Sequence, residues 1–187
     1  MINFTAAIDE ADLGGILQLQ KENLPGALTK VEIQTQGFLT VKHSLELLKS
    51  LNDIEKHIIG KDGDKVVAYL LAMTKKSEKE IPVLFSLFEK FRKIQFKNKT
   101  ISDYNYLVVG QVCVHKNYRG QGILDDCYAA YRDYYKEKYT FAITEIANSN
   151  QRSLNAHKRI GFTEIHQYEN DDGTRWNIVI WDWRNGK

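Results

Sequence analysis

Residues 112–123 read Val-Cys-Val-His-Lys-Asn-Tyr-Arg-Gly-Gln-Gly-Ile, an apolar run that passes into a basic turn with two glycines. The apolar part is typical of a buried strand, and a helical pattern follows Gly122. Backbone N–H groups at the start of a helix lack intrahelical partners and lie at the positive end of the helix dipole. Gly120 and Gly122 permit close approach because they have no Cβ, while Lys116 and Arg119 add positive charge. The stretch therefore predicts a binding turn for a phosphate-like anion.

Two common phosphate motifs do not fit this turn. The Gly-Lys-Ser/Thr ending of a P-loop is missing, and so are the third glycine and the downstream acidic residue of a dinucleotide-binding motif. Taken alone, the turn is more often a basic surface turn that caps a helix.

A second informative stretch, residues 150–162, reads Asn-Gln-Arg-Ser-Leu-Asn-Ala-His-Lys-Arg-Ile-Gly-Phe. Asn150 is a favourable N-cap and Gly161 a favourable C-terminal stop, so the residues between them are expected to form a helix. Capping alone accounts for both. Ser153 and His157 are four residues apart and therefore share one face of that helix.

Composition excludes several classes of protein. The chain has 187 residues, 43% hydrophobic and 27% charged, which is typical of one globular domain spanning residues 1–187. The net charge of +2 gives no argument for a nucleic-acid partner. The longest apolar run, 66–73, is far below the roughly 20 residues of a membrane span, and Met1–Thr5 lacks the features of a signal peptide. Cys113 and Cys127 lack metal-ligand spacing, so we expect no metal and buried free thiols in a cytoplasmic protein.

Periodicity predicts a mixed α/β domain. The expected strands are residues 2–8, 57–59, 66–73, 106–114, 141–147, 162–168 and 176–183, with an Asp-Gly hairpin turn after the second. Helices are expected after Asp9, over 44–54, over 82–94 with Pro82 near its start, after Gly122, and over 151–160.

In order and spacing, the two stretches resemble the two cofactor motifs of the GNAT superfamily of acyl-CoA N-acyltransferases. The family's pyrophosphate loop reads Arg/Gln-x-x-Gly-x-Gly/Ala, and residues 119–124 match its first and fourth positions, with Leu124 where Gly or Ala is usual. The resemblance implies a central, mostly antiparallel sheet of six to seven strands that splays between the fourth and fifth, with helices on both faces. Gly110 is a candidate for the bulge that causes the splay.

The resemblance also implies a cofactor, acetyl-CoA, and the residues that hold it. By this resemblance, the backbone amides of Gln121, Gly122 and Ile123 are expected to bind the pyrophosphate, together with Arg119, Gly120 and Leu124. The residues expected to contact the pantetheine arm and the thioester are Val112, Cys113, Val114, Asn150 and Ser153, with His157 nearby.

The implied reaction is direct transfer of an acetyl group to an amine in a ternary complex. His157 stands where many family members carry a tyrosine that protonates the departing thiolate, and it is the candidate acid. Glu145 is the candidate base, Gln111 a residue that orients water, and the backbone amide of Cys113 the candidate oxyanion donor. Two structural alternatives stay open: His157 as a packing residue, and Glu145 paired with a base or facing solvent.

The amine acceptor is not identified by the sequence. Candidate wall residues are Gly37, Phe38, Leu39, Thr40, Tyr104, Tyr106 and Trp176. The Phe-rich helix over 82–94 either covers the acceptor cleft or forms a homodimer contact. Two other functions remain open: a non-catalytic acyl-CoA-binding sensor or interaction module on the same fold, and an unrelated anion-binding α/β protein.

Overall fold

A seven-stranded sheet forms the centre of the protein, in the order β1-β2-β3-β6-β7-β9-β8. The computed structural model describes residues 1–29, 31–32, 39, 41–79 and 85–185. The strands are β1 (Asn3–Ala6), β2 (Ile58–Asp62), β3 (Lys65–Met73), β6 (Tyr106–Val114), β7 (Phe141–Ala147), β8 (Thr163–Glu169) and β9 (Arg175–Asp182). Within this sheet β6 and β7 are parallel and all other neighbours are antiparallel. The expected mixed, mostly antiparallel sheet is confirmed.

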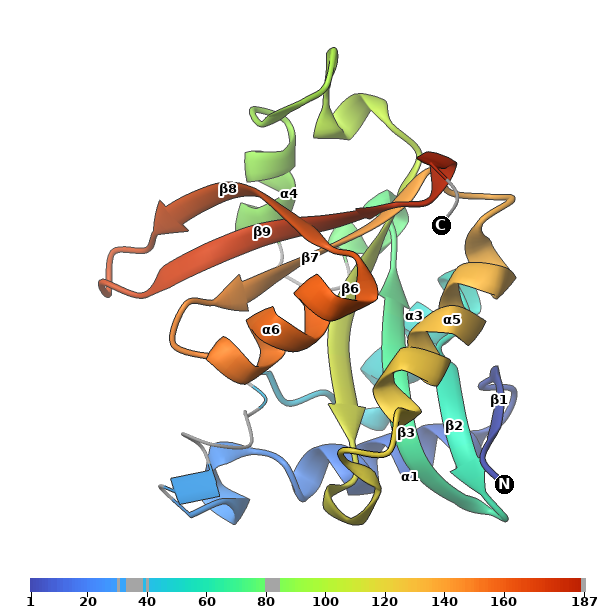
Figure 1. The fold of residues 1–187 in the computed structure, drawn as a ribbon. Coiled ribbons are helices and arrows are strands. Elements are labelled where there is room, and N and C mark those ends of the chain that lie inside the picture. The colour runs from blue at the N-terminus through green and yellow to red at the C-terminus, as the bar shows by residue number, and fades with distance from the viewer. Residues whose placement is uncertain (30, 33–38, 40, 80–84, 186–187) are drawn as a thin grey trace.

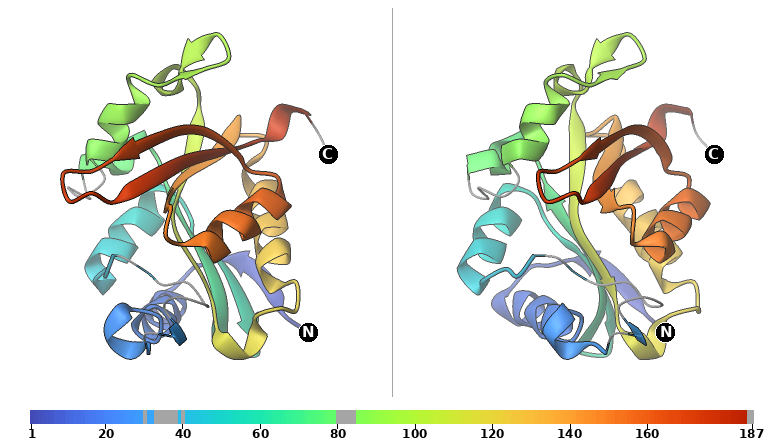
Figure 2. Two further views of the ribbon diagram at one scale, coloured as in Figure 1. Left: turned by 60° about the vertical axis from the view of Figure 1, so that its left-hand side comes forward. Right: turned by 90° about the vertical axis from the view of Figure 1, so that its left-hand side faces the viewer.

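Helices cover both faces of the sheet, as expected (Figure 2). On one face lie α1 (Glu10–Lys21), α3 (Leu45–Ile54) and α4 (Phe85–Phe91), and on the other lie α5 (Ile123–Tyr135) and α6 (Gln151–Ile160). Side chains of β3 alternate between two buried clusters: Tyr69 and Leu71 join the α1 side, whereas Leu70 and Ala72 join the α5 side. Such alternation is what a strand buried on both faces requires.

The predicted local signals position these elements. Asp9 caps α1 by accepting a hydrogen bond from the Asp12 amide, and Ser44 caps α3 in the same way through the Leu47 amide. Gly63 has φ of 58° in the turn between β2 and β3, a conformation that favours glycine. None of the helices within the described residues is both long and apolar enough to cross a membrane.

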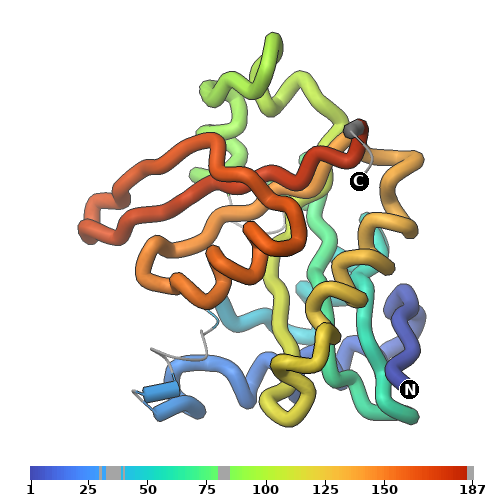
Figure 3. Tube along the Cα trace, viewed as in Figure 1, coloured from blue at the N-terminus to red at the C-terminus, as the bar shows by residue number. Residues whose placement is uncertain are grey.

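The chain makes a long excursion, residues 74–105, between the neighbouring strands β3 and β6 (Figure 3). It contains η2 (Lys75–Lys79), α4, the two-residue strands β4 (Gln95–Phe96) and β5 (Lys99–Thr100), and η4 (Ile101–Asp103). The β4–β5 hairpin was not expected, because strands this short carry no detectable period. Shorter turns elsewhere are η1 (Pro25–Ala27), η5 (Lys116–Tyr118) and η6 (Trp183–Asn185).

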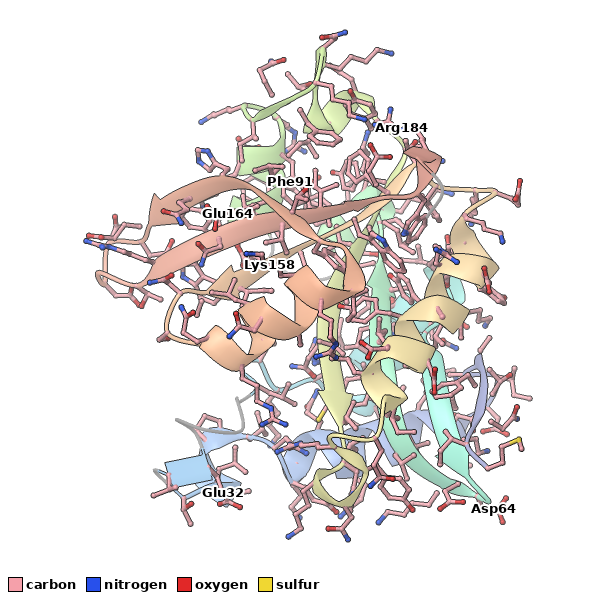
Figure 4. All side chains as sticks on the ribbon, in the orientation of Figure 1. Glu32, Asp64, Phe91, Lys158, Glu164 and Arg184 are labelled. Carbon is pink, nitrogen blue, oxygen red and sulfur yellow. The ribbon has the colours of Figure 1, made fainter. Side chains whose placement is uncertain are left out.

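Helix α4 is shorter than the predicted 82–94 segment. Pro82 and Leu84 lie outside the described residues, and Ile94 follows the end of the helix. Phe91, labelled in Figure 4, packs edge-on against Tyr106, with ring centroids 5.4 Å apart. Leu87 and Phe88 are buried in the same cluster, so this apolar side faces the protein's own core. The homodimer stays a prediction.

Strands β6 and β7 separate soon after they meet (Figure 1). Their pairing covers Tyr106–Val108 against Phe141–Ile143. The register between β3 and β6 shifts so that Leu71 faces Gln111 and Ala72 faces Val109, which leaves Gly110 as the extra residue of a bulge. A Cβ at Gly110 would lie 2.2 Å from the end of the Met73 side chain. The predicted bulge and splay are confirmed.

The buried Thr144 hydroxyl closes the point of divergence by donating to the Val109 carbonyl at 2.8 Å. Thr144→Val keeps the shape but leaves that carbonyl without its partner, so we expect the free energy of unfolding to fall by about 1–2 kcal/mol. Urea unfolding measures this. The control is Thr163→Val, whose hydroxyl makes a longer, 3.4 Å contact to the Ile180 carbonyl. Equal destabilisation by both variants would contradict the role given to Thr144.

Candidate functional site

The divergence of β6 and β7 opens a cleft of about 600 Å³. Eleven of the predicted cofactor residues line it: Val112, Cys113, Val114, Arg119, Gly120, Gly122, Ile123, Leu124, Asn150, Ser153 and His157. Gln121 is not among the lining residues, and its side chain instead donates to the Asn117 carbonyl. Glu145 and Gln111 also line the cleft. The fold thus gathers almost all candidates, from both motifs, around one space.

The anion end of the cleft is the start of α5. Gly120 and Gly122 have φ of 74° and 81°, and among the described residues, the chain neighbours aside, no atom lies within 4 Å of a Cβ built on either. No side chain caps the helix, whose hydrogen-bond ladder begins with Asp126 donating to the Gly122 carbonyl. The amides of Ile123 and Leu124 therefore precede the ladder and suit an anion.

Arg119 forms part of the cleft wall. Its Nε donates to the Val114 carbonyl at 3.0 Å, and its Nη2 donates to the side-chain oxygen of Asn23. Burial lowers the pKa of Arg119. Asn23, just after α1, is itself buried and lines the cleft. Sequence reasoning missed this residue because nothing local marks a partner so distant in the chain.

Helix α6 contributes two cations that the sequence analysis also missed. Arg152 and Arg159 both line the cleft, and Arg159 pairs with Asp125 of α5 at 2.8 Å. The two arginines are seven residues apart, about two helical turns, and so lie on one side of α6. That spacing is the signal from which they were predictable. Within the described residues, no group of His, Cys, Asp and Glu is placed to hold a metal ion.

The predicted caps of α6 are confirmed. The Asn150 side chain accepts from the Ser153 amide at 3.2 Å, and Gly161 ends the helix with φ of 118°. These contacts fix the helix that carries His157 into the cleft wall.

His157 is held by hydrogen bonds at both ring nitrogens. The Ser153 carbonyl, 2.8 Å from Nδ1, can only accept, so Nδ1 carries the proton and Nε2 accepts from the Tyr128 hydroxyl at 2.6 Å. The ring is 2% exposed, and burial lowers its pKa to about 4. In this arrangement His157 is neutral and directs no proton at the cleft, which favours its packing role.

The oxyanion donor predicted at Cys113 needs correction. His115 donates its amide to the Val67 carbonyl, so it forms a hydrogen-bonded pair with β3. Inter-strand bonds repeat every second residue, and Cys113, opposite Tyr69, therefore also directs its amide at β3. By the same alternation, the backbone groups of Val112 and Val114 point into the cleft.

Glu145 and Gln111 lie toward the α1 side of the sheet, opposite His157. Burial raises the pKa of Glu145, and its carboxylate accepts a hydrogen bond from Tyr168. The Gln111 amide is held by Gln20, Tyr69 and the Val41 carbonyl. The cleft thus reaches both faces of the sheet through the gap between β6 and β7.

Only some of the predicted acceptor-wall residues line this cleft. Leu39 and Trp176 do so. Tyr104 and Tyr106 instead form an aromatic cluster with Phe141 and Phe96. Gly37, Phe38 and Thr40 lie outside the described residues.

Comparison with models of protein families identifies one family. Residues 28–162 match the sequence model of the Acetyltransferase (GNAT) family. A search of curated proteins by sequence gives no match.

Among solved structures, three similar chains are described here. One belongs to the NatC complex bound to Gag peptide and CoA, with 14% identity, a TM-score of 0.63, and coverage of 97% of this chain and 98% of that one. The ribosomal-protein-S18-alanine N-acetyltransferase from Escherichia coli has 13% identity, a TM-score of 0.62 and coverage of 97% and 94%. A GNAT-family acetyltransferase from Streptococcus agalactiae has 10% identity, a TM-score of 0.66 and coverage of 97% and 95%. At these identities the likeness establishes the fold.

The neutral state of His157 predicts a dependence of stability on pH. Its folded pKa of about 4 lies below the ordinary value of 6.5, so the unfolded chain binds the extra proton between these values. Its contribution to stability is complete above pH 6.5 and is lost as pH falls toward 4. One such proton gives a slope of about 1.4 kcal/mol per pH unit.

His157→Phe removes the titrating ring, so the slope of unfolding free energy against pH should decrease by about that amount between pH 6 and 4.5. Urea unfolding across this range measures it. His43 and His57, buried with pKa values of about 4 and about 3, keep their own part of the slope. An unchanged slope in His157→Phe would show that this ring is not held neutral by the fold.

Proposed function

The chain belongs to the GNAT acetyltransferase family, and from that premise we propose that it transfers the acetyl group of acetyl-CoA to a primary amine of a small molecule or peptide. The observation that carries the proposal is the cleft between β6 and β7, which joins an anion site at the start of α5 to a half-buried carboxylate on the opposite face. In acetyl-CoA the pantetheine arm joins the pyrophosphate to the reactive thioester, so this part of the molecule fits such a passage.

The residues present suit this donor. The open space above Gly120 and Gly122 leaves the amides at the start of α5 accessible to the pyrophosphate. Arg152 and Arg159 add positive charge beside it. The amide and carbonyl of Val112 and the amide of Val114 are turned away from β3 and offer strand-like hydrogen bonds to the pantetheine arm, whereas the Val114 carbonyl already accepts from Arg119.

Glu145 is the proposed general base. An amine is mostly protonated at neutral pH and must lose a proton before its lone pair attacks the thioester carbon. Glu145 takes that proton, and the lone pair of the amine forms the C–N bond, which leaves the nitrogen of the tetrahedral intermediate with a positive charge. The nitrogen then loses a second proton, the C–S bond breaks, and the departing CoA thiolate takes up one proton in its place. Since burial raises the pKa of Glu145, it is a better proton acceptor than an exposed carboxylate.

We assign the oxyanion of the tetrahedral intermediate to the Val112 amide, because the sheet register turns this donor into the cleft. The thiolate then gains a proton. His157 lines the cleft but donates its Nδ1 proton to Ser153, so acting as the acid requires it to exchange that bond. His157→Phe with unchanged turnover at saturating acetyl-CoA would exclude the acid role.

The remaining proposals concern the wall of the acceptor end, the cellular location and the oligomeric state. Leu39 and Trp176 give the acceptor end an apolar wall next to Glu145. Both cysteines are free and buried, which supports a cytoplasmic location. Phe85 of α4, with 54% of its surface exposed, is the feature that supports a homodimer.

Thiol release from acetyl-CoA across a panel of amines tests the proposed function. We expect turnover with at least one amine, and a rise in melting temperature with acetyl-CoA alone. Stabilisation without turnover on any amine would favour the non-catalytic sensor, and no stabilisation at all would contradict acetyl-CoA as the donor.

Glu145→Gln tests the base. The amide cannot accept the amine proton, so kcat/KM for the amine should fall about a hundredfold or more. The dissociation constant of acetyl-CoA should stay within about twofold, because Glu145 lies away from the anion end. A loss of acetyl-CoA binding equal to the loss of activity would assign Glu145 to donor binding.

A further inference from the structure

The Glu145 carboxylate is tied at one oxygen and open at the other. Its Oε2 accepts a hydrogen bond from the Tyr168 hydroxyl. Its Oε1 makes no hydrogen bond to any residue that the structure describes, and it is not among the fully buried polar atoms that lack a partner. Because Glu145 lines the cleft, this second oxygen is the one that a substrate amine can reach.

Sheet geometry explains why a tyrosine makes this contact. Strand β9 lies between β7 and β8, with Glu145 opposite Ile178 and Tyr168 opposite Trp176. Ile178 and Trp176 are two residues apart, so all four side chains lie on one face. Neighbouring strands are about 4.8 Å apart, so Tyr168 must reach across an intervening strand. A long side chain with a terminal donor meets that requirement.

Tyr168 is in turn covered by a cation. The Nζ of Lys90 lies 4.1 Å from the centroid of the Tyr168 ring, a cation–π geometry. Lys90 belongs to α4, within the excursion between β3 and β6. Three segments distant in sequence, α4, β8 and β7, therefore converge on one carboxylate.

We infer that Tyr168, backed by Lys90, is a positioning residue for the proposed base: its hydroxyl fixes Oε2 of Glu145 and leaves Oε1 directed at the amine. This inference rests on the proposed function, in which Glu145 accepts the amine proton. Tyr168 itself exchanges no proton with the substrate in this scheme.

The charges around Glu145 agree with this role. Burial raises the pKa of Glu145, whereas the Tyr168 hydrogen bond and the Lys90 charge lower it. Burial and the neighbouring carboxylate raise the pKa of Tyr168, so the phenol keeps its proton and remains a donor. The other ionisable groups on the packed elements are Glu164, His166 and Glu169 of β8, Glu89 of α4, Cys113 of β6, and Arg175 and Asp182 at the two ends of β9. Arg175 pairs with Glu169, Asp182 with Lys97 and Glu89 with Arg92, and the charge that lowers the pKa of Glu145 comes from Lys90.

Tyr168→Phe should move the acidic limb of the kcat/KM–pH profile to higher pH. Without the hydrogen bond, Glu145 keeps its proton to higher pH and is protonated in a larger fraction of molecules. At pH 7 we expect kcat/KM to fall about tenfold and to recover largely at alkaline pH. Lys90→Met, which keeps the aliphatic stem, should shift the limb in the same direction by less. Acetyl-CoA binding should be unchanged in both.

The chain offers a matched control of the same chemistry outside the cleft. Tyr139 donates to the buried carboxylate of Glu55, and Lys138 lies 5.3 Å from the Tyr139 ring centroid. Tyr139→Phe and Lys138→Met remove the corresponding groups there. They should affect stability but leave the pH profile of kcat/KM in place.

The outcomes separate the inference from the proposed function. Full activity in Glu145→Gln removes the base and contradicts the proposed mechanism. An inactive Glu145→Gln together with an unmoved limb in Tyr168→Phe and Lys90→Met overturns the positioning role alone. A limb that moves equally in Tyr139→Phe also overturns it, because the effect would then come from general loosening. Should Tyr168→Phe fail to fold, the direction of the limb in Lys90→Met decides.

Discussion

The site depends on one constraint: β6 and β7 are joined as parallel neighbours for three residue pairs and then separate. A bulge at Gly110 bends β6, and the Thr144 hydroxyl takes the place of the next ladder bond. Beyond that point the strands expose backbone N–H and C=O groups that would be hydrogen-bonded between strands in a continuous sheet. Helices cover both faces of the sheet, and the exposed strand edges line a cleft that is open to solvent.

Burial sets the chemistry along this passage. On the α5 side it keeps His157 neutral and engaged, while on the α1 side it raises the proton affinity of Glu145. The same physical effect thus keeps His157 uncharged and raises the pKa of the proposed base, Glu145. At the other end, the Arg152 charge lies near enough to Arg119 to lower its pKa, and Arg159 pairs with Asp125 in the first turn of α5.

Local signals in the sequence were sufficient for the elements that build the cleft. The strands 106–114 and 141–147 and the helix 151–160 have the predicted bounds, because their apolar runs and caps are complete within a few residues of chain. Contacts between distant segments were not predictable. The bond from Arg119 to Asn23 and the reach of Tyr168 across β9 depend on register and strand order, which no single stretch encodes. Likewise, the sequence alone does not tell whether the backbone amide of Cys113 or that of Val112 points into the cleft, because this depends on the register between β6 and β3.

Arg119 has a consequence for how the two ends of the cleft communicate. One guanidinium bonds the end of β6 and the residue that follows α1, so it belongs both to the turn at the anion end and to the helix near the acceptor end. While both bonds hold, a displacement of the turn is carried to the segment after α1. Any such coupling is reciprocal: if a ligand at one end changes the binding free energy of a ligand at the other end, the second ligand changes the binding free energy of the first by the same amount. A side chain identified as part of a phosphate motif is therefore also, by its contacts, a link between the end of β6 and the segment after α1.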